Sequence, residues 1–254
     1  MEPIRAQVNE SSRDVVAIVS DNSSAAASIT WPHSGAGIAN CLGVPGTLGC
    51  IAYTLDTGRP VLLSTWHVLF GNGAKEGGAV WLRIESAGNR HFAAIGKALY
   101  GKLGTVHFDG RDYHLDCAVS SYDKALTTLA DGSRLPSAPS VTGYDSPRLG
   151  GLVTKRGNAT GITRGTLVDI GYSGSACVEG NPFSTPGQIL VRPLGENEVF
   201  SAEGDSGALI VDEANNAVGL LWGSNVRGEG LACPIAPVLY AMNITLAPPA
   251  HLSS

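Results

Sequence analysis

The sequence predicts an all-β fold, on the basis of its composition and of the way its apolar segments are spaced. Glycine accounts for 33 of the 254 residues, aromatic residues for 6% and charged residues for only 15%. The apolar segments are short, and glycine, proline or polar residues interrupt them at close intervals. This profile is typical of short strands joined by tight turns, rather than of a helical bundle or a disordered chain.

The first half of the chain begins with a polar extension and continues as a series of strands. Residues 1–35 are expected to lie outside the strand-rich part, with one strand-like segment at 15–19. A hairpin turn is expected at 56–60, where Gly and Pro interrupt the apolar pattern. Strands are expected at 46–53, 61–70, 79–84, 93–99 and 113–119.

The second half begins after a segment rich in Pro, Ser and Gly at 130–139, which is the best candidate for a domain boundary. The apolar segment 234–242 is predicted to form a short closing helix. Strands are expected at 151–153, 165–170, 188–191, 207–211 and 218–222.

A Gly-Asp-Ser-Gly segment carries the first indication of chemistry. Ser206 follows Asp205 and lies between the glycines at 204 and 207, in an acidic turn just before the apolar segment 208–211. Gly204 and Gly207 allow an unusual backbone path, so the amides of Gly204 and Ser206 could point into one small space and bind an oxyanion. The same four residues are also common in surface turns, so the segment alone leaves both interpretations open.

One histidine and one aspartate lie in apolar segments upstream of this serine. His67 lies in the segment 61–70, and Asp116 lies in the segment 113–119. A lone histidine in such a segment is usually an ordinary core residue. An ionised carboxylate entering an apolar strand is costly unless it is paired, and an imidazole N–H is a suitable partner. The order His67, Asp116, Ser206 favours a catalytic triad.

These segments together resemble the chymotrypsin-like (trypsin-like) serine proteases, of the bacterial intracellular trypsin-like peptidase type. The resemblance rests on Ser64-Thr65-Trp66-His67, Leu115-Asp116-Cys117-Ala118-Val119 and Gly204-Asp205-Ser206-Gly207. Residues 220–223 resemble the substrate-binding edge strand of that family, and residues 153–166 resemble the first hairpin of the second barrel in bacterial members. The match spans roughly residues 46 to 240.

The resemblance implies two six-stranded antiparallel β-barrels with a short C-terminal helix. The N-terminal extension would comprise residues 1–35. The first barrel, carrying the histidine and the aspartate, would comprise residues 36–130. The second barrel, carrying the serine, would comprise residues 131–254, and the active site would lie between the two barrels.

The resemblance also implies a serine endopeptidase that acts on protein or peptide substrates through an acyl-enzyme. Ser206 would attack the peptide carbonyl, His67 would transfer the proton, and Asp116 would orient the imidazole. The amides of Gly204 and Ser206 would form the oxyanion hole. No cofactor is required by this chemistry.

Substrate preference follows from the same resemblance. Phe200, six residues before Ser206, would lie at the base of the primary specificity pocket, where an acid would favour Lys or Arg. Trp222 and Gly223 would form the wall of the pocket, and Glu203 would lie at its rim. A bulky phenylalanine indicates a shallow apolar pocket for small or medium uncharged side chains, although Glu203 could attract a basic one.

Charged residues near the motif are expected to be structural. In the resembled family the residue before the nucleophile, here Asp205, is held by a partner that is often a new N-terminus made by cleavage. The sequence contains no unambiguous activation site, so the need for a cleavage or for an activating partner stays open. Lys155 and Arg156 are expected in a solvated turn, although they could also lie near bound substrate.

The net charge and the cysteine content limit which partners and which cell compartment are expected. The net charge of −5 gives no electrostatic footprint for nucleic acid or for anionic lipid, and no apolar run approaches a membrane span of about 20 residues. No secretory signal is visible, and secreted family members carry cysteines where Val68 and Ala202 stand here. A reducing compartment, the cytoplasm, is therefore expected. The odd set of five cysteines shows no zinc-site spacing: Cys41, Cys50, Cys117, Cys177 and Cys233.

Two alternative functions are considered, an esterase and a protease that has lost or not yet gained activity. The segment 171–175 half-resembles the nucleophile elbow of an esterase, but the only histidine downstream of it is His251, in a Pro-rich tail. The second alternative is a latent or inactive protease that uses its cleft as a protein-binding module. Asp109 and Asp112 compete with Asp116 for the role of the acid, yet they flank what reads as a solvated turn.

Overall fold

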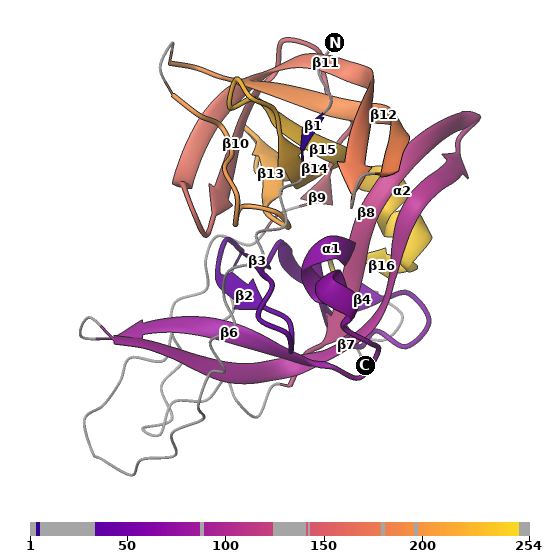
Figure 1. Cartoon of the computed structure of the whole chain (residues 1–254). Helices are drawn as coiled ribbons and strands as arrows, with labels where there is room; N and C mark the ends of the chain where they lie inside the picture. Colours follow the sequence, from indigo (N-terminus) through magenta and orange to yellow (C-terminus); the bar gives the residue numbers. More distant parts are fainter. Residues whose placement is uncertain are drawn as a thin grey trace.

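The prediction of an all-β fold is confirmed by the computed structural model, in which two sheets and two short α-helices make up the described chain (Figure 1). The predicted crossing at 130–139 lies outside the described residues, as does the predicted extension apart from residues 4–5 and 34–35. The structure describes residues 4–5, 34–86, 89–123, 141, 143–178, 181–195 and 198–248.

The first sheet contains strands β2 to β8 and one C-terminal strand, β16, in the spatial order β16-β4-β5-β8-β7-β6-β2-β3. Only two residues separate β3 from β4, so these segments act as one bent strand that pairs with β2 at one end and with β5 at the other. The sheet therefore curves back on itself as a barrel. Its strands are β2 (Gly37–Ala39), β3 (Pro45–Thr47), β4 (Cys50–Thr54), β5 (Pro60–Ser64), β6 (Ala79–Ser86), β7 (Asn89–Phe108), β8 (Arg111–Ser121) and β16 (Ile244–Thr245).

The second sheet has the order β1-β11-β10-β13-β14-β15-β12, and the pairing of β11 with β12 closes six of its strands into a barrel. The short strand β9 pairs with β14 at the margin. The strands are β1 (Ile4–Arg5), β9 (Gly143–Tyr144), β10 (Leu152–Gly157), β11 (Gly161–Val178), β12 (Asn181–Pro193), β13 (Leu209–Asp212), β14 (Asn216–Ser224) and β15 (Gly230–Pro234).

The helices are few and short. The helical turn α1 (Trp66–Leu69) and the 3-10 turn η1 (Gly71–Gly73) follow β5. The predicted closing helix is confirmed as α2 (Ile235–Met242), which ends at Asn243, a residue with φ of 51°. After this left-handed residue the chain enters β16 and pairs with β4, so the C-terminal segment returns to the first sheet.

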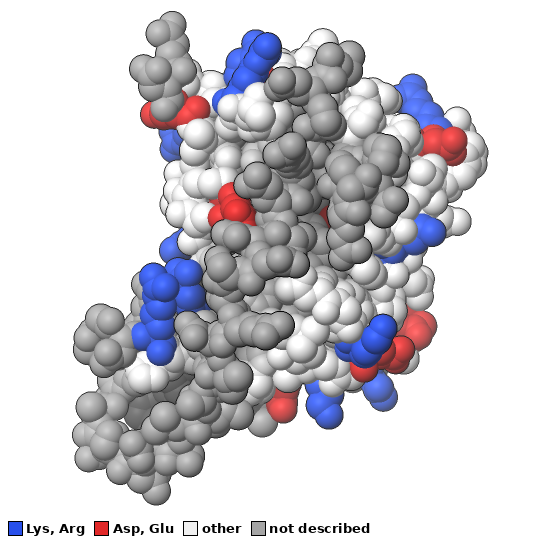
Figure 2. Space-filling view, viewed as in Figure 1, with Lys and Arg blue, Asp and Glu red and all other residues white. Residues whose placement is uncertain are grey.

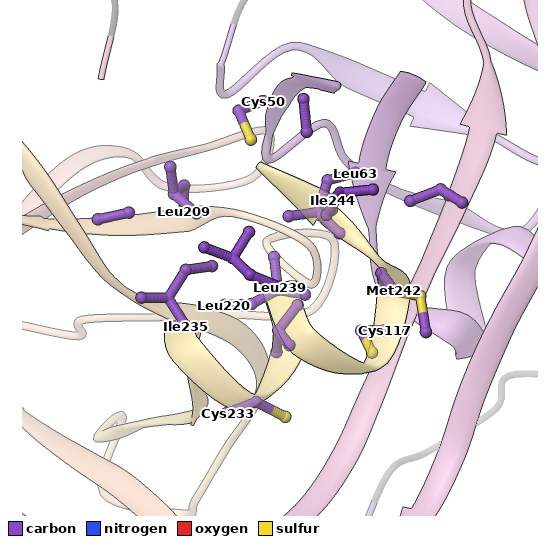
Figure 3. Close-up of a cluster of buried hydrophobic side chains, with 14 of the residues drawn as sticks. Cys50, Leu63, Cys117, Leu209, Leu220, Cys233, Ile235, Leu239, Met242 and Ile244 are labelled. Atoms are coloured by element: carbon purple, nitrogen blue, oxygen red, sulfur yellow. The ribbon is translucent and has the colours of Figure 1, made fainter. Parts of the chain in front are cut away.

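A single apolar cluster joins the two barrels. It contains side chains from both sheets and from α2, and Figure 3 shows Leu63, Cys117, Leu220 and Leu239 of this cluster close together. Burying one such leucine contributes about 1.5–3 kcal/mol, so the shared cluster is a strong tie between the barrels. The seam between the barrels is therefore anchored on a common core.

The described surface carries charges of both signs. Figure 2 shows lysine, arginine, aspartate and glutamate side chains scattered over one face, with uncharged residues between them. Among the described residues, no helix has the length and apolar character needed to cross a membrane.

Candidate active site

The sequence predicted that His67 lies at the end of a strand, but the structure places it in the helical turn α1. Strand β5 ends at Ser64, and the Phe70 N–H donates to the Trp66 carbonyl at 2.8 Å to close one turn. Val68 and Leu69 on this turn are buried, so the apolar residues that read as a strand instead anchor the turn in the core of the first barrel. His67 is thereby held at the barrel edge, with 38% of its side chain exposed.

The carboxylate of Asp116 holds His67 at two points. The imidazole Nδ1 lies 2.6 Å from Asp116 Oδ2, and the backbone N–H of His67 donates to Asp116 Oδ1 at 3.1 Å. Asp116 lies on β8, and only 6% of its side chain is exposed. This contact fixes the ring orientation and favours the tautomer with the proton on Nδ1, which leaves Nε2 free to accept a proton.

The two groups shift each other's pKa. Burial acts most strongly on His67 and lowers its pKa, but the charge and hydrogen bond of Asp116 outweigh burial and raise the pKa above 6.5. For Asp116, burial acts in the opposite direction and raises the pKa. The charge and hydrogen bonds of His67, with a smaller influence from His114, outweigh burial and lower the pKa of Asp116 below 3.8. At neutral pH Asp116 is therefore a carboxylate, as the orienting role requires.

Cys233 supports the backbone beside Asp116 from the second barrel. Its Sγ accepts a hydrogen bond from the Asp116 N–H at 3.4 Å and donates to the His114 carbonyl at 3.4 Å. Burial is the main cause that raises the pKa of the Cys233 thiol well above its ordinary value, which keeps the thiol protonated. The sequence did not indicate this contact, because Cys233 and Asp116 lie far apart in the chain.

Ser206 lies on the second barrel but packs against the first. The Ser206 carbonyl accepts a hydrogen bond from the Thr47 N–H at 2.8 Å. A Cβ added to Gly46 would clash with Val68 and would lie 3.1 Å from the Ser206 carbonyl oxygen. Gly46 is therefore in close contact with the neighbour of His67 on one side and with Ser206 on the other.

The Ser206 hydroxyl donates to the Trp222 carbonyl at 3.3 Å, and within the described residues it makes no hydrogen bond to His67. Hydrogen bonds between catalytic groups are often long or misaligned in the absence of substrate. The structure thus joins His67 to Asp116 directly and brings Ser206 to the same seam.

The amides proposed for the oxyanion hole have no other partner. Among the described residues, the N–H groups of Gly204 and Ser206 make no hydrogen bond, whereas the Asp205 N–H donates to the Ala202 carbonyl at 3.0 Å. Gly204 and Gly207 adopt φ values of 98° and 96°. These left-handed values favour glycine, and they give the loop the path that leaves the two amides unpaired.

Asp205 is fully buried and is held by an internal cation. Its Oδ2 lies 2.9 Å from Lys155 Nζ, and neither side chain is exposed. Thr160 Oγ1 donates to the same oxygen at 2.6 Å, and the backbone N–H groups of Ala159, Thr160 and Ala202 donate to the carboxylate at 2.8, 3.1 and 3.2 Å. Burial raises the pKa of Asp205, but the bonds from Lys155 and Thr160 outweigh it and lower the pKa below 3.8.

The predicted position of Lys155 in a solvated turn is wrong. Lys155 lies on β10 and is 1% exposed, because Val153, Lys155 and Gly157 form the buried face of that strand. Burial lowers the pKa of Lys155, and Asp205 opposes that effect. Burial alternates along this strand, but the residues Leu-Val-Thr-Lys-Arg-Gly at 152–157 do not alternate between apolar and polar, so the sequence contains no local signal that this lysine lies inside the barrel.

The residues predicted to bind substrate occupy different environments. Phe200 is fully buried, and a Cβ added to Gly165 or Gly230 would meet its ring. Trp222 is 7% exposed and donates from Nε1 to Gln188 Oε1 at 2.6 Å. A Cβ added to Gly223 would meet nothing within 4 Å, so the space above it is open, and Glu203 is exposed.

Asp112, which competes with Asp116 for the role of the acid, and His114, which lies close to Asp116 in the sequence, contact other residues. Asp112 lies 2.8 Å from Nδ1 of His107, and both side chains are exposed, as expected for a solvated turn. His114 is buried beside Phe183 and Trp222, with ring centroids 4.9 and 6.0 Å away, and its burial lowers its pKa.

Comparisons with known proteins support the fold. No protein-family model matches the sequence. The structure is similar to that of Cellulomonas bogoriensis chymotrypsin, at 18% identity with a TM-score of 0.51, covering 86% of this chain and 99% of that one. It is also similar to Thermobifida fusca protease A, at 16% identity with a TM-score of 0.53 and the same coverage of 86% and 99%. A Nocardiopsis protease shares 17% identity with a TM-score of 0.51, covering 84% and 97% of the two chains. The chain therefore has the double-barrel fold of the chymotrypsin-like serine proteases, as its motifs predicted.

Proposed function

We propose that this protein is a serine endopeptidase that hydrolyses peptide bonds through His67, Asp116 and Ser206. The observation that carries the proposal is a double contact between Asp116 and His67 on the same seam as Ser206. A buried carboxylate that holds both the ring and the backbone of a half-exposed histidine orients a general base. Protein or peptide substrates are proposed because the fold is similar to that of solved serine proteases.

The proposed reaction is acyl transfer to water in two steps. Ser206 Oγ attacks the carbonyl carbon and loses its proton to His67 Nε2, and the protonated His67 then gives that proton to the departing amine as the C–N bond breaks. Water then attacks the acyl-enzyme ester and loses a proton to His67, which returns that proton to Ser206 Oγ as the carboxylic acid product leaves. Asp116 stays ionised throughout and stabilises the imidazolium.

The amides of Gly204 and Ser206 would stabilise the negative charge on the carbonyl oxygen in both steps. Between residues 204 and 208, they are the two N–H groups that make no hydrogen bond to any part of the chain that the structure describes. A donor that is already oriented and unpaired costs little reorganisation during the reaction. Removing one such donor typically lowers kcat by about 100- to 1,000-fold.

A fluorophosphonate probe tests this proposal, because it reacts only with an activated serine. We expect the wild-type protein to be labelled, and Ser206→Ala and His67→Ala to abolish both labelling and hydrolysis of a denatured protein substrate. Ser146→Ala is the matched serine control, since Ser146 is exposed between β9 and β10 and lies on none of the elements that carry His67, Asp116 or Ser206. A labelled Ser206→Ala variant would contradict the assignment of the nucleophile.

We further propose that cleavage follows small or medium uncharged residues. Phe200 is fully buried, and its ring occupies the space beside Gly165 and Gly230, so no acid lies at this position. A peptide library is expected to be cut after uncharged residues of small or medium size. Strict cleavage after Lys or Arg would contradict this role of Phe200 and would point to exposed Glu203 as the determinant.

One observation favours the second candidate, a latent protease or a protein-binding module. The Ser206 hydroxyl donates to the Trp222 carbonyl rather than to His67. If wild-type protein fails to react with the probe and with every peptide in the library, the binding module is the better description.

A further inference from the structure

Thr47 joins the first barrel to the loop that carries the nucleophile. It is the last residue of β3 and is fully buried. Its backbone N–H donates to the Ser206 carbonyl at 2.8 Å, and its hydroxyl donates to the Gly204 carbonyl at 2.8 Å. One residue on the first barrel therefore holds the carbonyls of both residues whose amides make no hydrogen bond among the described residues, through its side chain at Gly204 and its backbone at Ser206.

The direction of the hydroxyl bond is fixed by a second contact. Thr47 Oγ1 accepts a hydrogen bond from the backbone N–H of Asn158 at 3.0 Å. A hydroxyl has one proton to donate, and among the described residues this proton goes to the Gly204 carbonyl. Thr47 itself is secured by Ser64, whose Oγ donates to the Thr47 carbonyl at 2.8 Å.

We propose that Thr47 is a positioning residue for the oxyanion hole, an inference that rests on the proposed function. Gly204 has a φ of 98°, in a region where glycine is conformationally permissive, so its peptide planes are free to reorient unless something holds them. The Thr47 hydroxyl supplies that restraint at Gly204, and the Thr47 N–H supplies it at Ser206. The Gly204 carbonyl belongs to the peptide between Gly204 and Asp205, which lies between the two peptides that carry the amides of Gly204 and Ser206. Holding this peptide at Gly204, and the next but one at Ser206, limits how far the two amide-bearing peptides can rotate.

The hydroxyl and the backbone of Thr47 can be separated by substitution. Thr47→Val keeps the shape and the backbone N–H but leaves the Gly204 carbonyl without its donor, whereas Thr47→Ser keeps the hydroxyl. We expect Thr47→Val to lower kcat by about 10- to 100-fold with KM changed less than about twofold, because the loss affects the transition state. Thr47→Ser should stay within about threefold of wild type.

The matched control is Thr185→Val, because Thr185 is a buried threonine whose hydroxyl has no hydrogen-bond partner among the described residues. A second measurement is the affinity for a peptidyl trifluoromethyl ketone, whose hemiketal oxyanion binds in the hole. Thr47→Val should weaken this affinity by about the same factor as kcat, and a substrate-like product peptide should bind unchanged. Equal loss of both affinities, or kcat unchanged in a folded Thr47→Val variant, would overturn the proposal.

A readout that does not depend on turnover separates this inference from the proposed function. The amide resonances of Gly204 and Ser206 in ¹⁵N spectra should shift or broaden in Thr47→Val, and should stay close to wild type in Thr47→Ser and Thr185→Val. If wild type is inactive but these amides respond, the proposed function fails and the positioning role stands. If wild type is active and the amides and kcat do not respond, the positioning role fails alone.

Discussion

Lys155→Met is expected to lower the free energy of unfolding by about 3–5 kcal/mol and to remove most of the activity. The substitution keeps much of the apolar length of the side chain but leaves the Asp205 carboxylate buried without its cation. Such a charge is costly in the barrel interior. The loop from Ala202 to Ser206 is built around that carboxylate, so its disturbance displaces the oxyanion amides as well.

Chemical denaturation of Lys155→Met and of the double variant Lys155→Met/Asp205→Asn measures this effect. The double variant should recover part of the lost stability, because its buried amide carries no charge. Lys75→Met, at an exposed lysine, is the matched control and should change the stability by no more than about 0.5 kcal/mol. A stability of Lys155→Met equal to that of Lys75→Met would contradict the account of this ion pair.

Asp116→Asn is expected to lower kcat/KM by about 10,000-fold while the protein stays folded. The amide would present an N–H where the carboxylate accepts a proton, and it would favour the wrong imidazole tautomer of His67. The charge of Asp116 also raises the pKa of His67. Only neutral His67 can accept a proton, so wild-type activity should fall as the pH decreases through a pKa above 6.5.

The pH profile of kcat/KM for the two proteins checks this prediction. In Asp116→Asn the charge that raises the pKa of His67 is gone, so the residual activity should persist to lower pH than in wild type. Asp112→Asn is a matched control on the same strand, because Asp112 is exposed and pairs with His107. An unchanged acidic limb in Asp116→Asn would contradict the pairing of Asp116 with His67.

The sequence was sufficient for the fold class and for the residues that bear the motifs. Local patterns carried this information: short strands between turn residues, and a serine between two glycines that adopt positive φ. A short helix at 234–242 was also predicted from its apolar run, and the structure has it at Ile235–Met242. These features depend on neighbouring residues in the chain.

Contacts across the seam could not be predicted in this way. The hydroxyl of Thr47 reaches Gly204 over 157 residues of chain, and Cys233 reaches Asp116 over 117. Neither contact leaves a local pattern. Lys155 was misplaced because two adjacent charged residues were read as a surface turn, whereas the burial of this lysine depends on Asp205, which lies 50 residues further along the chain. The helical turn at His67 was read as a strand because its apolar residues run on from β5.

The position of the covalent adduct tests the central claim most directly. After wild-type protein is treated with the fluorophosphonate and digested, tandem mass spectrometry should find one modified residue, Ser206, and mild acid should slow the labelling as His67 becomes protonated. An adduct on any other residue, or labelling of Ser206 that does not depend on His67, would contradict the account.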